Sequence, residues 1–387
     1  MDTWVRPIRR GWVVRGEVPG PDVDEFAEPD AVITALASPG AAGDTLLAVQ
    51  HPARTPAALA RGLDLAAALP SARAALARIR ARHYRSVAGF VAPYRISGPD
   101  GVAVGVLCLV DVRELTAGGS HVRHTEDVYP HVVAERAAVL AGLGTATSAA
   151  LLVPSSGGAL LTAAVEAACA GLGLPDVSTV DLAGRRHELW VVPSGTLQER
   201  LVAAASAADL LVADGNHRVA AAAQTGSLLA LVTGGPSLRI GAIHRVLTGT
   251  GLTSSDLASA WRSAGLEVGV TTDGTPPSRP GSVVVLARPS MLRVVLPPAD
   301  ELTIDHAVVE ELLFSSALGL DLDGPHVHPL PAGRPAPSDA DAVVQLAPVE
   351  YSTVLKVHAA GLRMPRKATY FTPKPRGGLV LAEIQDV

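Results

Sequence analysis

The chain has 387 residues, a formal net charge of −5 at pH 7, 48% hydrophobic residues and only 3% aromatic residues. This length exceeds what one small core needs, so we expect one large domain or two closely packed ones. The acidic balance and the scarcity of aromatic side chains disfavour a nucleic-acid partner. No apolar run reaches the roughly eighteen residues of a membrane span. Two cysteines far apart in the sequence are typical of a reducing compartment, so we expect a cytoplasmic protein.

The first part of the chain, residues 1–150, is expected to be a mixed α and β region. Residues 55–82 have apolar side chains at helical spacing, with a break between two helices at Pro70. The runs "SVAGFVAPYRI" and "GVAVGVLCLVDV" flank "SGPDG", which predicts a hairpin. Residues 132–142 follow as a helix that ends at glycines.

The second part, residues 151–270, is expected to hold the core of the protein. The strand "AALLVP" precedes a helix over 159–172, and "STVDLAGRRHELWVV" predicts a hairpin. Residues 196–208 are helical and lead into "LLVADGNHRVAAAAQTGSLLALVTGG" at 210–235. That stretch predicts a strand, a polar turn, an alanine-rich helix and a second strand.

The third part, residues 282–387, follows a loop rich in proline and glycine at 271–281 and is expected to complete the cleft. Its predicted elements are the hairpin "SVVVLA" and "LRVVLP", a helix over 305–318 and a second proline-rich loop at 325–342. Strands and helices interleave without regular alternation. The sequence therefore predicts an α+β fold with mixed sheets and flanking helices, although the three parts could also form one compact unit.

Lysine is rare in this chain: only Lys356, Lys367 and Lys374 occur, against 29 arginines. Because arginine is otherwise preferred, two interpretations of these lysines stay open: they serve where a compact ammonium is needed, or they are ordinary surface residues. Lys367 precedes and Lys374 ends the stretch "ATYFTPK", which predicts a strand bounded by Pro365 and Pro373. We expect this strand to lie in the cleft.

The turn at 214–218 gathers five residues suited to binding an anion. Gly215 permits a tight turn and close approach of the backbone, and Asn216 is a good N-cap. His217 and Arg218 add a donor and a bidentate cation at the same helix end, where unpaired N–H groups favour phosphate. Asp214 is placed to act as a base or a metal ligand. The alternative is an ordinary capped helix with a surface arginine.

Other polar residues allow more than one interpretation. Glu126 is either a catalytic carboxylate or an exposed acid near a helix start, and His187 either stabilises its hairpin or contributes to the site. His244 and Arg245 fit a site or the surface equally well. "HVH" at 326–328 is a weak metal signal because no third ligand lies nearby.

Several motifs resemble one family. "VADGNHRVAAA" at 212–222 resembles the "IADGHHRYETA" signature of the bacterial family called domain of unknown function 1015. "MPRKATYFTPKPRGGLVL" at 364–381, "DLAGRRHELW" at 181–190, "IHRVL" at 243–247 and "RPIRRGWVV" at 6–14 are similar to further blocks of that family, in the same order.

The chain departs from the family pattern at two places. The first histidine of DGHHR is Asn216, which can cap or form hydrogen bonds but cannot titrate. The usual "HE" pair is approximated by His124 and Glu126, with Thr125 between them. If the missing histidine carries a proton in relatives, Asn216 does not replace it.

The DGxHR turn is also similar to that of the ParB/sulfiredoxin superfamily, whose members bind nucleotide phosphates there, and one branch of which phosphorylates free serine. The resemblance implies a ParB/sulfiredoxin-like core and a kinase that uses ATP or ADP with Mg²⁺ on a small hydroxylated metabolite, with serine or a related amino acid as the first candidate. The catalytic residues would be Glu126, Asp214, His217 and Arg218, with Asp214 as the metal ligand. The cofactor would be bound by Gly215, Asn216, His217, Arg218 and Lys367, and the substrate by His187, His244, Arg245 and Lys374.

Two other functions stay open. One is a nucleotide-responsive switch protein without turnover, and the other is a phosphohydrolase that uses the same anion site. A homodimer is also compatible with the sequence. Fold resemblance alone does not assign chemistry.

Overall fold

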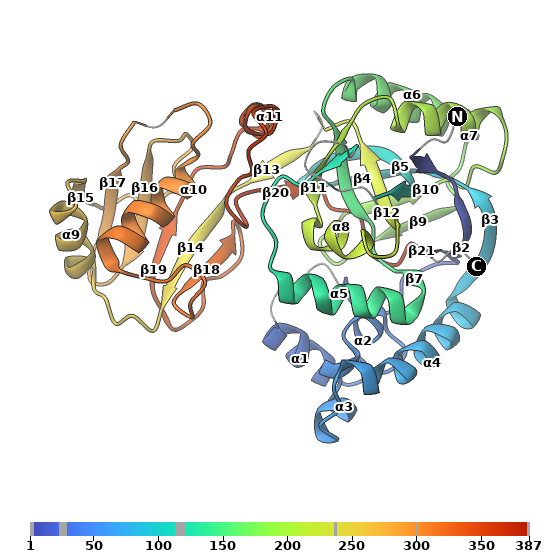
Figure 1. Ribbon diagram of the computed structural model, residues 1–387, viewed down its shortest axis with the longest axis horizontal. Helices are drawn as coiled ribbons and strands as arrows, with labels where there is room; N and C mark the ends of the chain where they lie inside the picture. The colour runs from blue at the N-terminus through green and yellow to red at the C-terminus, as the bar shows by residue number, and fades with distance from the viewer. Residues whose placement is uncertain (1–3, 23–28, 113–120, 236–237, 299, 385–387) are drawn as a thin grey trace. The chain divides into compact units, whose positions relative to one another are not determined.

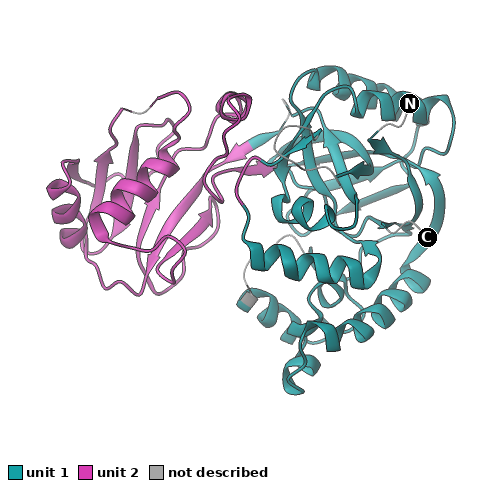
Figure 2. Ribbon diagram, viewed as in Figure 1, with its two compact units in different colours: residues 1–124, 128–239, 373–387 teal, residues 125–127, 240–372 magenta. Residues whose placement is uncertain are grey.

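The structure is a computed structural model that describes residues 4–22, 29–112, 121–235, 238–298 and 300–384. It contains several sheets and many helices without regular alternation, which confirms the expected α+β class (Figure 1). Two compact units divide the chain (Figure 2). Unit 1 comprises residues 1–124, 128–239 and 373–387, and unit 2 comprises residues 125–127 and 240–372. The three-part division expected from the sequence stays a prediction.

Unit 1 contains a nine-stranded sheet and a four-stranded sheet. The nine-stranded sheet has the order β6 (Val122–Arg123), β11 (Leu210–Asp214), β8 (Ala150–Pro154), β12 (Ser227–Thr233), β5 (Gly101–Asp111), β4 (Ala92–Gly98), β10 (Arg186–Leu189) and β9 (Val177–Val180), with β1 (Val5–Arg6) also paired to β5. The four-stranded sheet has the order β3 (Tyr84–Phe90), β2 (Ile8–Val14), β21 (Val380–Glu383) and β7 (Thr145–Ala146).

The helices of unit 1 lie around these sheets (Figure 1). They are α1 (Pro29–Ala37), α2 (Leu46–Gln50), the 3₁₀ turn η2 (Pro52–Arg54), α3 (Pro56–Ala60), α4 (Leu65–His83), α5 (Pro130–Leu143), α6 (Gly158–Leu172), α7 (Thr196–Ala205) and α8 (Asn216–Ala222). The predicted helix ending at glycines is confirmed, because α5 ends at Gly144, whose φ of 63° is left-handed. The predicted hairpin is confirmed as well, because Gly98 and Gly101 close the antiparallel pair β4–β5.

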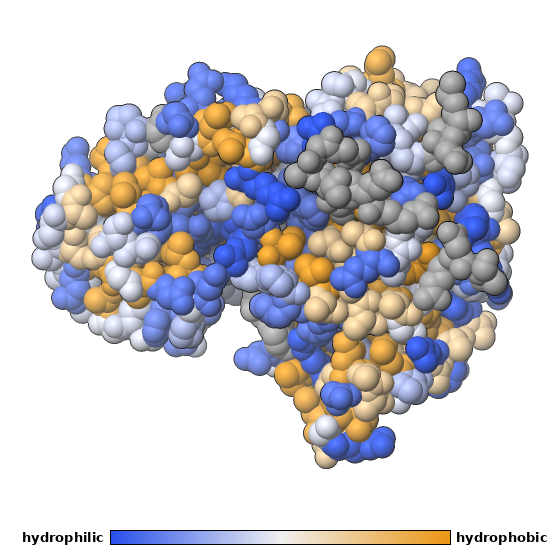
Figure 3. All heavy atoms as spheres, viewed as in Figure 1, coloured by the Kyte–Doolittle hydropathy of each residue, from blue (hydrophilic) through white to orange (hydrophobic). Residues whose placement is uncertain are grey.

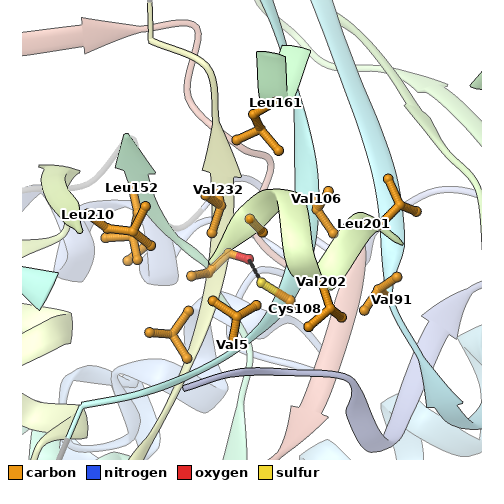
Figure 4. Packing of buried hydrophobic residues seen from close by; sticks show 14 of the residues in the cluster. Val5, Val91, Val106, Cys108, Leu152, Leu161, Leu201, Val202, Leu210 and Val232 are labelled. Atoms are coloured by element: carbon orange, nitrogen blue, oxygen red, sulfur yellow. Dashed lines mark hydrogen bonds between the residues drawn. The ribbon is translucent and has the colours of Figure 1, made fainter. Parts of the chain in front are cut away.

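One core of unit 1 lies between the nine-stranded sheet and its helices. Val106 and Cys108 of β5, Leu152 of β8 and Val232 of β12 pack in it with Leu201 of α7 (Figure 4). These side chains are at most 1% exposed. Burial of each aliphatic side chain contributes about 1.5–3 kcal/mol, so this core fixes the strands that lead to the turn at 214–218.

Unit 2 has its own sheet and core. The sheet has the order β15 (Glu267–Thr271), β17 (Met291–Val295), β16 (Ser282–Ala287), β19 (Ala340–Gln345), β14 (Ile243–Thr248) and β18 (Val327–Pro331). Its helices are α9 (Ser254–Ser263), α10 (Asp305–Val308), the π-helical segment η3 (Val309–Ser316) and α11 (Tyr351–Ala359). A capping box between Thr253 and Asp256 starts α9, whose Trp261 is fully buried. The short strands β13 (Arg239–Gly241) and β20 (Tyr370–Thr372) pair with each other.

Three sequence predictions about secondary structure are wrong. Pro70 lies inside α4 near its start, and the break between helices falls earlier, where the side chain of Asp64 caps α4. The proline-rich stretch 325–342 contains β18, because its prolines occupy an edge strand of the sheet. The strand expected between Pro365 and Pro373 shortens to β20, and Lys367 precedes it.

Apolar side chains also remain on the surface. Leu174 and Leu182 are 92% and 93% exposed. Figure 3 shows apolar residues interspersed with hydrophilic ones on the face that it views. Among the described residues, no helix has both the length and the apolar character needed to cross a bilayer.

Candidate functional site

The turn at 214–218 lies where β11 ends and α8 begins, as the sequence predicts. The register of β11 against β8 shifts between Val212 and Asp214, and such a bulge changes where the following side chain points. Gly215, with a φ of 95°, takes the N-cap position that was predicted for Asn216. A Cβ at this position would lie 2.7 Å from Nε of Arg218, so a larger residue would displace the guanidinium, and glycine takes the left-handed φ without strain.

Three side chains of unit 1 form a charge cluster: Asp214, Arg218 and Lys374. Asp214 accepts a hydrogen bond at one oxygen from Arg218 and at the other from Lys374. The second guanidinium arm of Arg218 donates to the hydroxyl of Ser148, which precedes β8. Antiparallel pairing of β8 with β11 brings Ser148 to this end of the sheet.

The three charged side chains of the cluster are partly accessible to solvent. Its side chains are 20% exposed at Asp214, 15% at Arg218 and 22% at Lys374. Ion pairs that are partly shielded from water interact more strongly than surface pairs. The guanidinium and the ammonium are thus placed where they can form charge-assisted hydrogen bonds with an incoming anion.

The backbone after Lys374 is held firmly in unit 1. Arg376 forms an ion pair with Asp22 at 3.2 Å and donates to the carbonyl of Gly20 at 2.8 Å. Its N–H donates to the hydroxyl of Tyr94 at 3.1 Å. These contacts fix the chain two residues beyond Lys374 and so restrict where its ammonium can reach.

Tyr94 belongs to a buried relay of hydrogen bonds. Its hydroxyl lies 2.7 Å from Nδ1 of His187, and Nε2 of His187 lies 3.2 Å from the carboxylate of Asp181. Since an ionised carboxylate only accepts, Nε2 carries the proton and Nδ1 accepts from Tyr94. Burial lowers the pKa of His187 by more than Asp181 raises it, so the ring is neutral. His187 is 1% exposed, and both ring nitrogens are used within the protein.

The other two side chains of the turn contact the segment before α5. Nε2 of His217 accepts from the N–H of Tyr129 at 3.0 Å, and the two rings stack with their centroids 5.8 Å apart. This bond requires the tautomer with its proton on Nδ1. Oδ1 of Asn216 lies 3.0 Å from Nδ1 of His124, so the amide oxygen accepts from the histidine ring instead of capping α8.

Four predicted site residues belong to unit 2 rather than to the charge cluster. Glu126 is 8% exposed, and its carboxylate accepts from the backbone of the turn that contains Lys367. Arg245 forms an ion pair with Glu310 at 2.6 Å, and Nδ1 of His244 accepts from a backbone N–H at 3.2 Å. Burial lowers the pKa of His244, with a further contribution from Arg245.

The residues around Asp214 do not fit a protein-held Mg²⁺. Both carboxylate oxygens already accept hydrogen bonds from cations. Within the described ranges, no group of three or more histidine, cysteine, aspartate or glutamate side chains could hold a metal ion. The weak zinc signal at 326–328 therefore has no such group around it among the described residues.

Sequence reasoning did not single out Ser148, Tyr129, Tyr94 or Asp181. Ser148, Tyr129 and Tyr94 reach the site through contacts between residues far apart in the chain. Asp181 opens the "DLAGRRHELW" block, in which the sequence assigned a role to His187 but none to this carboxylate. Asp181 and His187 do stand six residues apart across the predicted hairpin, and that proximity was the one available signal.

The fold is thus of the α+β class, with an ionic cluster at a strand-to-helix turn of unit 1. The sequence profile described as "Protein of unknown function (DUF1015)" matches residues 90–312, which is more than half of the chain. The chain belongs to this family.

Solved structures show only a distant likeness. A free serine kinase in complex with AMP is 11% identical, with a TM-score of 0.42, covering 72% of this chain and 91% of that one. A truncated SbnI from Staphylococcus aureus is 13% identical, with a TM-score of 0.38, covering 72% and 86%. A conserved hypothetical protein from Pyrococcus furiosus is 12% identical, with a TM-score of 0.38, covering 70% and 93%. No curated protein matches the chain.

Proposed function

We propose that the protein is a nucleotide-dependent phosphotransferase that acts on the hydroxyl group of a small metabolite. The observation that carries this proposal is the charge cluster, in which a carboxylate bridges a guanidinium and an ammonium at the start of α8. Phosphoryl transfer depends on cations that position and neutralise a phosphate and on a carboxylate near the acceptor hydroxyl. All three groups are present within one partly exposed cluster.

In this proposal the transferred phosphate competes with Asp214 for Arg218 and Lys374. Arg218 offers a planar bidentate donor, and Lys374 offers a compact charge, both of which suit phosphate oxygens. Displacement releases a carboxylate oxygen of Asp214 to accept the proton of the attacking hydroxyl. The hydroxyl oxygen forms the new bond to phosphorus, the old phosphorus–oxygen bond breaks, and the nucleotide leaves with that oxygen.

Ser148 and the hydrogen-bonded side chain of Tyr94 support the two cations in this scheme. The hydroxyl of Ser148 holds one arm of Arg218, so the guanidinium is oriented before a ligand arrives. Tyr94 holds the backbone of Arg376 and thereby limits the movement of Lys374. A site in which cations are positioned in advance needs little reorganisation during the reaction.

The first test is isothermal titration of ATP, ADP and CTP, with Mg²⁺ in the buffer, into the wild type and the variants Arg218→Ala, Lys374→Ala and His217→Ala. Loss of one charge-assisted hydrogen bond should weaken binding by about 10- to 100-fold in the first two variants. Lys356→Ala is the matched control, because Lys356 is a lysine 55% exposed and paired with Glu301. It should bind as the wild type does.

Turnover separates the proposed function from its alternatives. Incubation of the wild type with the bound nucleotide and a panel of hydroxylated metabolites, serine first, should give a phosphorylated product by mass spectrometry. Free serine kinase is among the similar structures, which suggests serine as a starting point only. Binding without any product would indicate a nucleotide-responsive switch protein, and release of inorganic phosphate without an acceptor would indicate a phosphohydrolase. No binding of any nucleotide to the wild type would refute the proposal.

A further inference from the structure

Lys367 of unit 2 has an unusual backbone conformation. Among the described residues it is the one non-glycine residue with a positive φ, 52°. Side chains with a Cβ avoid this region because the Cβ approaches the following carbonyl oxygen. A strained residue of this kind persists only where the surrounding structure holds it, and such residues concentrate at functional sites.

The surrounding structure holds this turn from its N–H side through Glu126. The carboxylate accepts from the backbone N–H groups of Lys367, Ala368 and Thr369 at 3.0, 3.2 and 3.0 Å. It also accepts from the hydroxyl of Thr369 at 2.8 Å. Three successive N–H groups that converge on one anion form a backbone nest. Glu126 fills this nest and has both oxygens engaged.

The same turn is held from its carbonyl side through Arg245. The guanidinium donates to the carbonyl oxygens of Arg366 and Lys367, each at 3.1 Å. Arg245 is 2% exposed and is fixed in turn by Glu310. Two buried charged residues of opposite sign therefore clamp the N–H and carbonyl groups around one lysine.

The side chain of Lys367 contrasts with this clamped backbone. It is exposed. Its neighbours Arg363 and Arg366 form ion pairs with Asp127 and Asp323. Within the described part of the chain, no acidic side chain pairs with the ammonium of Lys367. A costly backbone conformation thus presents one unpaired cation.

We propose that Lys367 binds an anionic ligand of the phosphate class, and that Glu126 and Arg245 are positioning residues that hold its turn. This inference does not rest on the proposed function, because it concerns groups of unit 2 and not the charge cluster. It assigns Glu126 a role different from the catalytic one that the sequence resemblance implied. It also explains why glycine, which fits a positive φ without strain, does not occupy this position.

The test combines stability with site-resolved protection of lysines. Acetic anhydride modifies accessible amines, and peptide mass spectrometry reports each of the three lysines separately. Inorganic pyrophosphate should slow acetylation of Lys367 at least threefold and leave Lys356 unchanged, while Lys374 reports independently on the charge cluster. Malonate, a dicarboxylate, distinguishes general attraction of anions from a preference for phosphate.

Three variants then separate strain from charge. Lys367→Gly should raise the Tm by about 2–4 °C, because it relieves the left-handed strain, and should weaken pyrophosphate binding in a calorimetric titration by about tenfold or more. Lys367→Asn tolerates the same φ without the charge and should weaken binding equally. Lys367→Arg keeps the charge and should retain binding. Stability gained without loss of binding would overturn the proposal.

Glu126→Gln tests the positioning role. It should weaken pyrophosphate binding several-fold in the wild-type background and have no further effect beside Lys367→Asn, because its influence acts through Lys367. Additive effects of the two substitutions would overturn the positioning role. Failure of the proposed function would appear differently, as loss of nucleotide binding or protection at Lys374 while protection at Lys367 persists.

Discussion

Replacement of Gly215 by alanine should damage the turn in two separable ways. The residue has a φ of 95°, and a left-handed conformation costs a residue with a Cβ about 1–2 kcal/mol. The new Cβ would also lie 2.7 Å from Nε of Arg218 and 3.2 Å from Cβ of Ala150. Such a contact requires a shift of about the kind that overpacking a core imposes, with a further cost of about 1–3 kcal/mol. The sum is about 2–5 kcal/mol.

Two other glycines isolate these contributions. Gly157 has a φ of 71° with no atom within 4 Å of an added Cβ, so Gly157→Ala should show only the backbone cost. Gly171 lies in α6 with open space and no positive φ, so Gly171→Ala should stabilise by about 0.5–1 kcal/mol. Differential scanning fluorimetry measures all three, at about 2–4 °C per kcal/mol.

The difference in Tm between Gly215→Ala and Gly157→Ala separates the cost of the contact with Arg218 from the cost of the backbone conformation. If both lower the Tm equally, Arg218 does not lie against the backbone of Gly215 as described. If Gly215→Ala lowers it further, the displaced guanidinium should also weaken nucleotide binding. A Gly215→Ala variant as stable as the wild type would refute the account of the turn altogether.

Three further results are expected. Burial lowers the pKa of His51 to about 3, so the ring stays neutral in the folded state, whereas in the unfolded state it is protonated below about pH 6.5. The free energy of unfolding should therefore fall by about 2 kcal/mol between pH 7 and pH 5 because of His51. His51→Gln should flatten this pH dependence in urea unfolding. Burial raises the pKa of Cys108 to about 12 and that of Cys169 to about 11, so neither should react with a thiol reagent at pH 8 until the protein unfolds, and rapid labelling of the native protein would contradict this. Tyr94→Phe leaves a ring nitrogen of His187 and a backbone N–H without their buried partner, and should destabilise by about 1–3 kcal/mol in thermal unfolding, whereas an unchanged Tm would contradict the relay.

Local features of the fold could be predicted from the sequence because local chemistry determines them. The hairpin at Gly98 and Gly101 and the helix end at Gly144 depend on turn residues within a few positions. The strand-turn-helix around Gly215 follows from a short apolar run and a glycine that permits a left-handed turn. Each of these features is determined by residues close together in the sequence and does not depend on contacts with distant parts of the chain.

Long-range features could not be predicted in this way. Glu126 and Lys367 lie 241 residues apart, and nothing in the composition of either segment indicates that a carboxylate fills the nest of that turn. Alternation of apolar residues placed Lys367 in a strand, but the clamp by Glu126 and Arg245 imposes a turn there instead. Tertiary contacts overrode the local pattern.

The chain order of unit 1 has a consequence for synthesis. Lys374 follows Asp214 by 160 residues, and most of unit 2 is encoded between them. At about 5–20 residues per second, Asp214 emerges from the ribosome about 8–32 s before its second cation. Throughout that interval Arg218 is the nearer partner in sequence, and β21 has not yet joined the four-stranded sheet. The charge cluster therefore forms late, because it can assemble only after the inserted unit has been translated.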